Sequence, residues 1–220
     1  MIEAPSPLVD RYVAAQLASD RSAALRLILD EGLGQGLAVP ALYRAIEAAQ
    51  HRIGVLWQEN RISVAQEHVA TAISQLVLAH LYPELPREPP NGKQVLVACV
   101  EGEQHDMGAR VAADFFEMAG FDVRFLGASV PRDALLAMIR ESAPDLLLLS
   151  ATMTFHLPLL RDTVLHSREA GGDRVRLAIG GHAISWTPRL VEQLAIDVPH
   201  GTAPQMIQSA RRVLGVEHAA

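Results

Sequence analysis

The sequence predicts an α/β protein in two parts, a helical bundle followed by a parallel sheet. Between 7 and 82 the apolar residues recur at helical spacing without a strand pattern, which favours a four-helix bundle. Four prolines within 83–92 indicate a stiff, extended linker. After it, five apolar runs alternate with helical segments, the pattern of a doubly wound, five-stranded parallel sheet. The predicted domains are therefore 1–82 for the bundle, 83–92 for the linker and 93–220 for a Rossmann-like domain.

The bundle helices are placed by their start signals. Ser6 before Pro7 is a cap followed by a proline at the first helical position, so the first helix begins there. Ser63 with Gln66 three residues later matches a capping box and begins the fourth helix. The second and third helices are expected at 22–31 and from about Pro40 to Trp57.

The sheet and its covering helices follow from the alternation after the linker. The strands are expected at 94–100, 122–126, 145–150, 174–179 and 196–198. The helices are expected at 107–119, 132–142, 157–170, 188–193 and 203–214. A flavodoxin-like strand order, 2-1-3-4-5, would put the ligand-binding switch point between strands one and three.

Composition excludes several kinds of partner. The 220 residues are 50% hydrophobic, enough for a substantial core, and the formal net charge is -6. Without a basic arm or a cluster of Lys and Arg, direct binding to nucleic acid is not expected. The single cysteine, Cys99, cannot form an internal disulfide and suits a reducing cytoplasm. The sequence has neither a signal-peptide pattern nor an apolar run long enough for a bilayer, so a cytoplasmic protein is expected.

The loop after the first strand carries the clearest candidate site. Glu103, His105 and Gly108 spell E-x-H-x-x-G between a buried strand and a helix, where α/β proteins bind ligands. The His105 imidazole can be an axial metal ligand, and the Glu103 carboxylate can hold its other ring nitrogen. Gly108 would let a large planar ligand approach the first helical turn, beside Asp106, which we include in the site. Taken alone, the pattern also fits a surface histidine with a local hydrogen bond.

Two further groups end neighbouring strands. Ser150 and Thr152 lie at the end of the third strand, and Gly180-Gly181 follows the fourth. The carboxyl ends of parallel strands meet at one edge, so these groups are expected near His105. Singly, a serine can simply end a strand and a glycine pair can make a turn, and only their joint placement indicates a ligand site. The nucleotide pattern G-x-G-x-x-G and the P-loop are absent from the sequence.

The bundle holds a second candidate group. Trp57 ends the third helix, and Glu67 and His68 lie in the second turn of the fourth, which together spell W-x9-E-H. An indole, a carboxylate and an imidazole near one another could form a lid aimed at a ligand. The alternative is a tryptophan that packs in the core and a glutamate that favours the helix N-terminus.

The α/β part resembles the cobalamin-binding domain of methionine synthase, methylmalonyl-CoA mutase and their relatives. The family's D-x-H-x-x-G, S-x-L and G-G appear here as Glu103-x-His105-x-x-Gly108, Ser150-x-Thr152 and Gly180-Gly181. The resemblance implies that His105 is the lower cobalt ligand, replacing the cofactor's dimethylbenzimidazole, whose tail would pass Ser150 and the glycines. Glutamate in place of aspartate should keep the link to the imidazole, and Thr152 in place of leucine affects local packing.

The bundle with Trp57, Glu67 and His68 is similar to the lid of CarH-type photoreceptors, which are adenosylcobalamin-dependent, light-sensing repressors. By that resemblance adenosylcobalamin is the cofactor, and Trp57 and Glu67 enclose its adenosyl group above cobalt. The winged-helix DNA-binding domain of those repressors is missing here, so a stand-alone module is expected. Gln58 also departs, because those photoreceptors commonly have a histidine there that takes the upper cobalt position after illumination.

These features favour a light sensor that regulates transcription indirectly. Its output would be a light-dependent contact with a second copy of itself or with a transcription regulator. The alternative is a corrinoid carrier protein of a methyltransferase system, which shares the bundle-plus-sheet layout without W-x9-E-H. A mutase subunit would need a barrel domain for its substrate. Neither a serine triad nor a paired acid and base stands out, so the chain is not expected to be an enzyme by itself.

Overall fold

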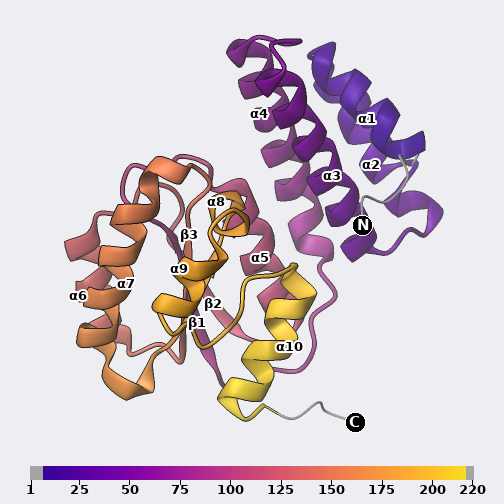
Figure 1. Ribbon diagram of the computed structural model, residues 1–220. Helices are drawn as coiled ribbons and strands as arrows, with labels where there is room; N and C mark the ends of the chain where they lie inside the picture. The colour runs from indigo at the N-terminus through magenta and orange to yellow at the C-terminus, as the bar shows by residue number, and fades with distance from the viewer. Residues whose placement is uncertain (1–6, 217–220) are drawn as a thin grey trace. The chain divides into compact units, whose positions relative to one another are not determined.

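The structure is a computed structural model that describes residues 7–216 (Figure 1). The chain divides between Pro86 and Arg87 into two compact units, each of which is described by itself. The division falls inside the predicted linker, and the finer domain limits given above stay predictions.

The first unit consists of four α-helices, as predicted. They are α1 Pro7–Leu17, α2 Arg21–Leu29, α3 Val39–Gln58 and α4 Val64–Leu81, with the short 3-10 helices η1 Leu33–Gln35 and η2 Tyr82–Glu84. Ser63 and Gln66 form the predicted capping box at the start of α4. Ser6, the predicted cap of α1, lies outside the described residues.

The four helices pack around an aliphatic core. Helix α1 contacts each of the other three, and α3 packs along α4. The buried residues of α3 recur at helical spacing and include Leu42, Ile46, Ala49 and Ile53. Gln16 and Ser74 are buried in the same core, so their polar atoms need partners within the bundle.

The second unit is a four-stranded parallel sheet in the order β2-β1-β3-β4. The strands are β1 Gln94–Cys99, β2 Asp122–Phe125, β3 Leu146–Ser150 and β4 Arg176–Gly180. This order confirms the predicted one for these strands. Strands β1 and β3 are apolar and almost wholly buried, as expected in a parallel sheet covered on both faces. The register puts Ser150 opposite both Cys99 and Gly180, so three strands end together at the carboxyl edge.

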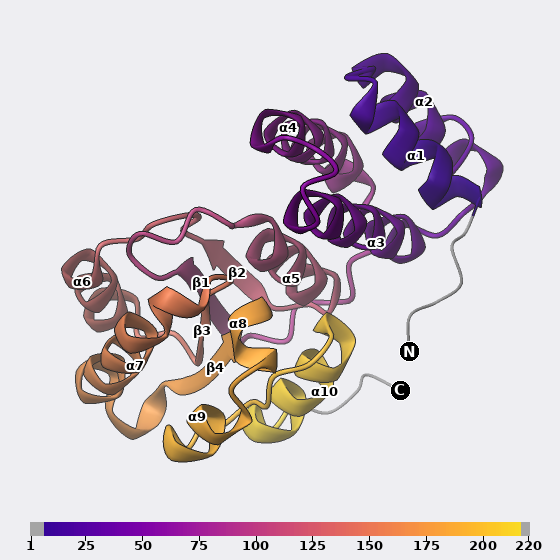
Figure 2. The same ribbon diagram turned by 45° about the horizontal axis from the view of Figure 1, so that its top comes forward.

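Helices cover both faces of this sheet. The longer ones are α5 Met107–Met118, α6 Arg132–Ser142, α7 Leu157–Gly171 and α10 Ala203–Leu214. Helices α5 and α10 pack together on one face, and α6 and α7 on the other (Figure 2). The shorter ones are η3 Thr154–His156, η4 Gly172–Arg174, α8 His182–Ser185 and α9 Pro188–Gln193. Within residues 7–216, no helix is both long and apolar enough to cross a membrane.

The predicted fifth strand at 196–198 is wrong. Within the described residues this segment forms only an isolated parallel bridge, from Val198 to β4. The N–H groups of Asp197 and Val198 both donate to the Leu177 carbonyl, while the Leu177 N–H donates to the Asp197 carboxylate at 2.8 Å. Pro199 follows and has no N–H to donate, so the ladder cannot extend.

The second half of the predicted linker lies against the end of α5. The N–H of Glu88 donates to the Met118 carbonyl, and that of Asn91 to the Gly120 carbonyl, at 2.9 Å each. Gly120 has a φ of 81°, and a Cβ there would lie 2.3 Å from the Pro89 carbonyl oxygen. Glycine at position 120 therefore lets the proline-rich segment pack on the α/β unit.

Candidate functional site

The loop from β1 to α5 is organised by Glu103, whose carboxylate is wholly buried. Its Oε1 accepts from the backbone N–H of His105 at 2.9 Å and from Nδ1 of the same residue at 2.6 Å. Its Oε2 accepts from the N–H groups of Thr152 and Met153 at 2.8 and 3.0 Å, and from Nδ1 of His156 at 2.9 Å. One carboxylate thus joins the loops that follow β1 and β3.

These hydrogen bonds keep Glu103 ionised. Burial by itself would raise the pKa of Glu103, but the donors from His105, Met153 and His156 outweigh burial and lower that pKa well below its usual range. An ionised carboxylate can only accept, so both imidazoles donate from Nδ1 and, when neutral, carry the lone pair on Nε2. The His105 side chain is 52% exposed. Glu103 therefore holds the half-exposed His105 ring in the tautomer whose Nε2 can bind a metal.

His156 is the member of this arrangement that the sequence pattern did not reveal. It lies in η3, 53 residues after Glu103, and its side chain is 13% exposed. The ring packs edge-on against Phe155, with 4.3 Å between the two centroids. The one available signal was its position just after the third strand, whose carboxyl end neighbours that of the first.

The glycines of the site fall into two kinds. A Cβ added to Gly108 or Gly180 would meet nothing within 4 Å, so the packing of the chain itself does not require glycine at either position. Gly181 has a φ of 98°, and a Cβ there would lie 2.2 Å from the Ala151 carbonyl oxygen, so the fold does require it. The open space at the first two glycines fits a ligand that lies close to the backbone.

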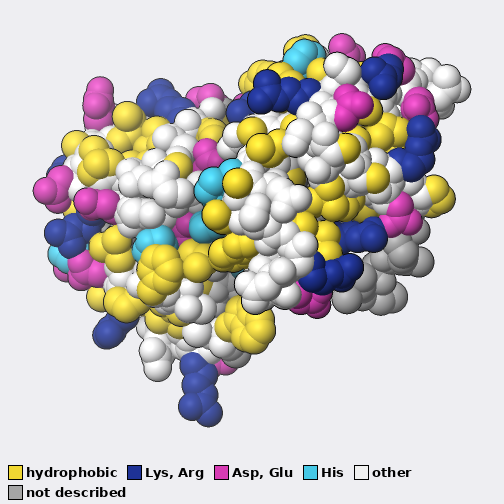
Figure 3. All heavy atoms as spheres, turned by 90° about the horizontal axis from the view of Figure 1, so that it is seen from above, with side chains coloured by type: hydrophobic (Ala, Val, Ile, Leu, Met, Phe, Trp, Pro, Cys, Tyr) yellow, Lys and Arg dark blue, Asp and Glu magenta, His cyan; other side chains and the backbone are white. Residues whose placement is uncertain are grey.

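The other predicted residues of this unit lie at the same edge. Ser150 is buried at the end of β3. Asp106 directly precedes α5, and its backbone N–H donates to the Gln104 carbonyl. Burial, and then the carboxylates of Asp106 and Glu103, raise the pKa of Cys99 to about 12, so this cysteine stays a thiol. Figure 3 looks onto this edge, where histidine side chains lie among hydrophobic ones.

The bundle candidates lie at the end of α3 and the start of α4. Trp57 is 37% exposed and is not part of the bundle core, and Gln58 ends α3. Glu67 accepts at Oε2 from Nδ1 of His68 at 2.6 Å and at Oε1 from the Thr71 hydroxyl at 2.7 Å. The structure thus brings Glu67 and His68 together, whereas Trp57 belongs to the neighbouring helix.

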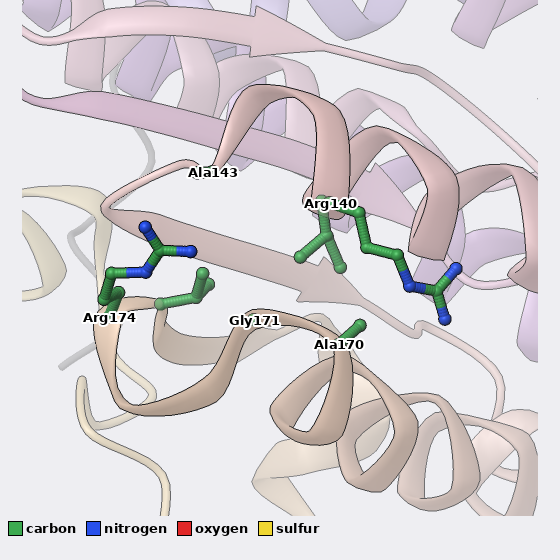
Figure 4. A pocket seen from close by; sticks show the side chains of 7 residues that line it. Arg140, Ala143, Ala170, Gly171 and Arg174 are labelled. Atoms are coloured by element: carbon green, nitrogen blue, oxygen red, sulfur yellow. The ribbon is translucent and has the colours of Figure 1, made fainter.

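A hollow of about 240 Å³ lies at the opposite edge of the sheet (Figure 4). It is lined by the ends of α6 and α7 and by the segment before β4, so it lies away from the loop of His105. Figure 4 shows that the guanidinium groups of Arg140 and Arg174 point in different directions. Polar groups that converge on one point are what a ligand pocket needs, so this hollow is not the site.

Across residues 7–216, no three His, Cys, Asp or Glu side chains lie close enough together to hold a metal ion. A single imidazole instead suits a metal whose other ligands come from a macrocycle, as with haem iron and its proximal histidine. The fixed imidazole, the open glycine backbone and the carboxyl edge of a parallel sheet define an α/β domain that binds a planar, metal-bearing cofactor.

Comparison with known families identifies that cofactor. Two family models, both described as B12 binding domain, match residues 93–208 and 8–82. The chain belongs to the B12-binding domain family, and its cofactor is cobalamin. The predicted cofactor is confirmed at this level, and the adenosyl form stays a prediction.

Similar proteins include corrinoid proteins and a transcriptional repressor. Dimethylamine corrinoid protein 3 of Methanosarcina acetivorans is 25% identical over 173 residues, 78% of this chain and 80% of that protein. The HTH-type transcriptional repressor CarH of Myxococcus xanthus is 29% identical over 175 residues, 79% of this chain and 58% of that protein. The structure of the Methanosarcina barkeri monomethylamine corrinoid protein has a TM-score of 0.81 at 20% identity, covering 96% and 98% of the two chains, and shows the same fold.

Most of the similar proteins are corrinoid proteins. This result favours the alternative of a corrinoid carrier over the light sensor that the bundle motif suggested. The resemblance to the cobalamin-binding family is confirmed, and the finer assignment to the CarH type is not.

Proposed function

We propose that the chain is a corrinoid carrier in which His105 is the lower cobalt ligand of the bound cobalamin. The observation that supports the ligand assignment is the buried, ionised Glu103, which holds Nδ1 of His105 at 2.6 Å and leaves the lone pair on Nε2. Cobalamin supplies a cobalt–carbon bond that can be formed and broken. The chain positions the imidazole, excludes other tautomers and presents the group on cobalt to a partner protein.

The remaining residues of the edge are proposed to line the cofactor. Gly108 and Gly180 leave open space beside the backbone, and Ser150 offers a buried hydroxyl at the end of β3. Glu103 holds the backbone of Thr152. Asp106 and Gly181 are included because they lie at the same edge of the sheet.

The carrier role is supported by the relatives, since a dimethylamine corrinoid protein matches this chain over most of both lengths. A carrier needs no catalytic group of its own, because a partner enzyme performs the transfer. The expected partner is therefore a methyltransferase.

A light sensor is the second candidate, and a specific observation favours it. Trp57 at the end of α3 is exposed, and the Glu67 carboxylate in α4 is held by Thr71 and His68. An indole and a fixed carboxylate match the base and hydroxyls of an adenosyl group better than a methyl group. The 29% identity to the repressor CarH supports the same role. Its partner would be a second copy or a transcription regulator.

Cofactor titrations test the ligand assignment. Purified protein is titrated with adenosylcobalamin and methylcobalamin in the dark, and the absorption spectra are compared with those of His105→Ala. The substitution should abolish the histidine-ligated spectrum and much of the affinity, whereas His166→Ala, a change of the same kind on α7, should alter neither. Unchanged spectrum and affinity in His105→Ala would refute the assignment.

The same preparation separates the two functions. Preference for methylcobalamin, with transfer of its methyl group by an added corrinoid methyltransferase, supports the carrier. Preference for adenosylcobalamin, with a change of elution volume in size-exclusion chromatography after green light, supports the sensor and overturns the carrier.

A further inference from the structure

The proline-rich segment between the two units consists of two halves that are held differently. Its first half continues the bundle, because η2 follows α4 directly and the N–H of Leu85 donates to the Tyr82 carbonyl at 3.3 Å. Its second half, residues 88–92, which we call the strap, lies on the α/β unit. The chain divides between the two halves, at Pro86 and Arg87.

Hydrogen bonds at both ends of the strap fix it to α5. The N–H groups of Glu88 and Asn91 each donate, at 2.9 Å, to a carbonyl at or just beyond the end of α5. The Asn91 side chain adds two bonds, since its Nδ2 donates to the Ala119 carbonyl at 3.3 Å and its Oδ1 accepts from the N–H of Lys93 at 3.0 Å. The strap is therefore part of the α/β unit and not a free tether.

Arg211 of α10 adds a second attachment for the strap. Its guanidinium donates both to the Glu88 carboxylate and to the Ala119 carbonyl, the latter at 3.1 Å. The Arg211 side chain is only 10% exposed, a position that arginine takes when it is paired, whereas the Glu88 carboxylate is half-exposed. Hydrogen bonds from a charged donor are stronger than those between neutral groups. A single side chain thus joins the strap, the end of α5 and α10.

We propose that Arg211 fastens the strap to the α/β unit and so confines the movement of the bundle relative to the sheet to a joint at Pro86 and Arg87. The proline ring fixes one backbone torsion of this joint, and the Arg87 side chain reaches a carboxylate of α5 at 3.3 Å, so few rotations remain. Helix α5 begins just after His105, so the joint is attached to the helix that carries the cofactor loop. Release of the strap would lengthen the joint from two residues to seven, 86–92. The inference does not depend on the choice between carrier and sensor.

Distances between spin labels on the two units measure this confinement. Labels are attached at exposed positions of α2 and α6 through Ser22→Cys and Glu141→Cys, and Cys99 is buried and so does not compete for the label. Pulsed electron paramagnetic resonance gives the distribution of label-to-label distances in the full chain, with and without Arg211→Met, which removes the guanidinium and keeps an apolar stem. Because the spread of a flexible chain grows as the square root of its length, the width of the distribution should roughly double in the variant.

Two further variants control the experiment. Arg212→Met makes the same change at the neighbouring, exposed arginine, whose guanidinium lies 3.3 Å from the Ser209 hydroxyl of the same helix, and should leave the width unchanged. Gly120→Ala displaces the strap by another route, because the added Cβ would lie 2.3 Å from the Pro89 carbonyl oxygen, and should broaden the distribution as Arg211→Met does. Thermal unfolding by circular dichroism shows that each variant is folded, and Gly120→Ala supplies the result if Arg211→Met does not fold.

Trypsin cleavage after Arg87 is an independent measure, because a protease must draw the residues around the bond into an extended conformation and the strap opposes this. Arg211→Met should be cut there about tenfold faster than the wild type, as expected for one lost hydrogen bond to a charged group. Arg212→Met should be cut at the wild-type rate, and mass spectrometry of the fragments identifies the site.

Three outcomes would overturn the inference: an unchanged width in Arg211→Met, equal broadening in Arg212→Met, or cleavage of Arg211→Met after Arg87 at the wild-type rate. None of these measurements needs cobalamin, so failure of the proposed function and failure of this inference are separate results.

Discussion

Replacing Glu103 by glutamine is the sharpest perturbation of the site, because it substitutes an NH₂ group for one acceptor oxygen. If the NH₂ group faced the loop after β3, it would oppose three donors, the N–H groups of Thr152 and Met153 and Nδ1 of His156. If it faced His105, it would oppose two, the backbone N–H and Nδ1 of that residue. The second orientation therefore has the lower free energy.

In that orientation His105 can move its proton to Nε2, so that Nδ1 accepts from the new amide. One buried backbone N–H then stays unpaired, which costs about 1–3 kcal/mol. The remaining bonds become neutral and roughly half as strong as charge-assisted ones. We expect Glu103→Gln to lower the free energy of unfolding by about 2–4 kcal/mol. It should also weaken cobalamin binding, because a protonated Nε2 cannot ligate cobalt.

Urea unfolding of the cobalamin-free protein at neutral pH measures the first effect, and the absorption spectrum of the loaded protein measures the second. Glu141→Gln, which neutralises an exposed carboxylate on α6, is the matched control and should change stability by less than about 0.5 kcal/mol. The reasoning would be refuted if Glu103→Gln unfolded like the control and bound cobalamin with an unaltered spectrum.

Three other outcomes are expected. Because the pKa of Glu103 is lowered in the folded chain, the contribution of this carboxylate to stability is complete above its unfolded pKa of about 4.3 and is lost as the pH falls further. Urea unfolding between pH 7 and 3 should show this loss of stability. A loss of equal size in Glu103→Gln would contradict it. Gly181→Ala should lower the free energy of unfolding by about 1–3 kcal/mol. Gly180→Ala should leave the free energy of unfolding unchanged and weaken cobalamin binding. Equal melting temperatures of the two variants would contradict this distinction. In a light sensor, Gln58→His should give a bis-histidine cobalt spectrum after illumination, and a water-ligated spectrum identical to that of the wild type would count against that role for position 58.

Much of the fold could be predicted because its signals are local. The apolar runs at β1 and β3, the alternation with helices and the Ser63–Gln66 capping box are each contained in a short stretch of sequence. The fifth strand was mispredicted because a strand also depends on how it pairs with its neighbour, here β4, which is another part of the sequence. Ile196 to Val198 look like a strand, but the Asp197 side chain takes the N–H of Leu177 that a strand would have paired.

In the candidate site, too, contacts between residues close in sequence could be predicted and contacts between distant residues could not. Glu103 and His105 are two residues apart, so their hydrogen bond could be expected from spacing. His156 is 53 residues from Glu103, and only the parallel pairing of β1 with β3 brings the two together. In the bundle, Glu67 and Thr71 are one helical turn apart and could have been paired from the sequence, whereas Gln50 reaches Thr71 only through the packing of α3 on α4.

The pairs Glu103–His105 and Glu67–His68 share one geometry and differ in what holds them. Glu103 and Glu67 each accept from Nδ1 of a nearby histidine at 2.6 Å. Glu103 is fixed by burial and by donors from two loops. His68 is 74% exposed, and an ion pair at such a surface contributes only about 0–1 kcal/mol by itself, too little to hold a carboxylate in one orientation. The Thr71 hydroxyl donates to the other oxygen of Glu67 at 2.7 Å and supplies the rigidity that the surface pair lacks, and Gln50 on the neighbouring helix holds that hydroxyl in turn at 2.9 Å.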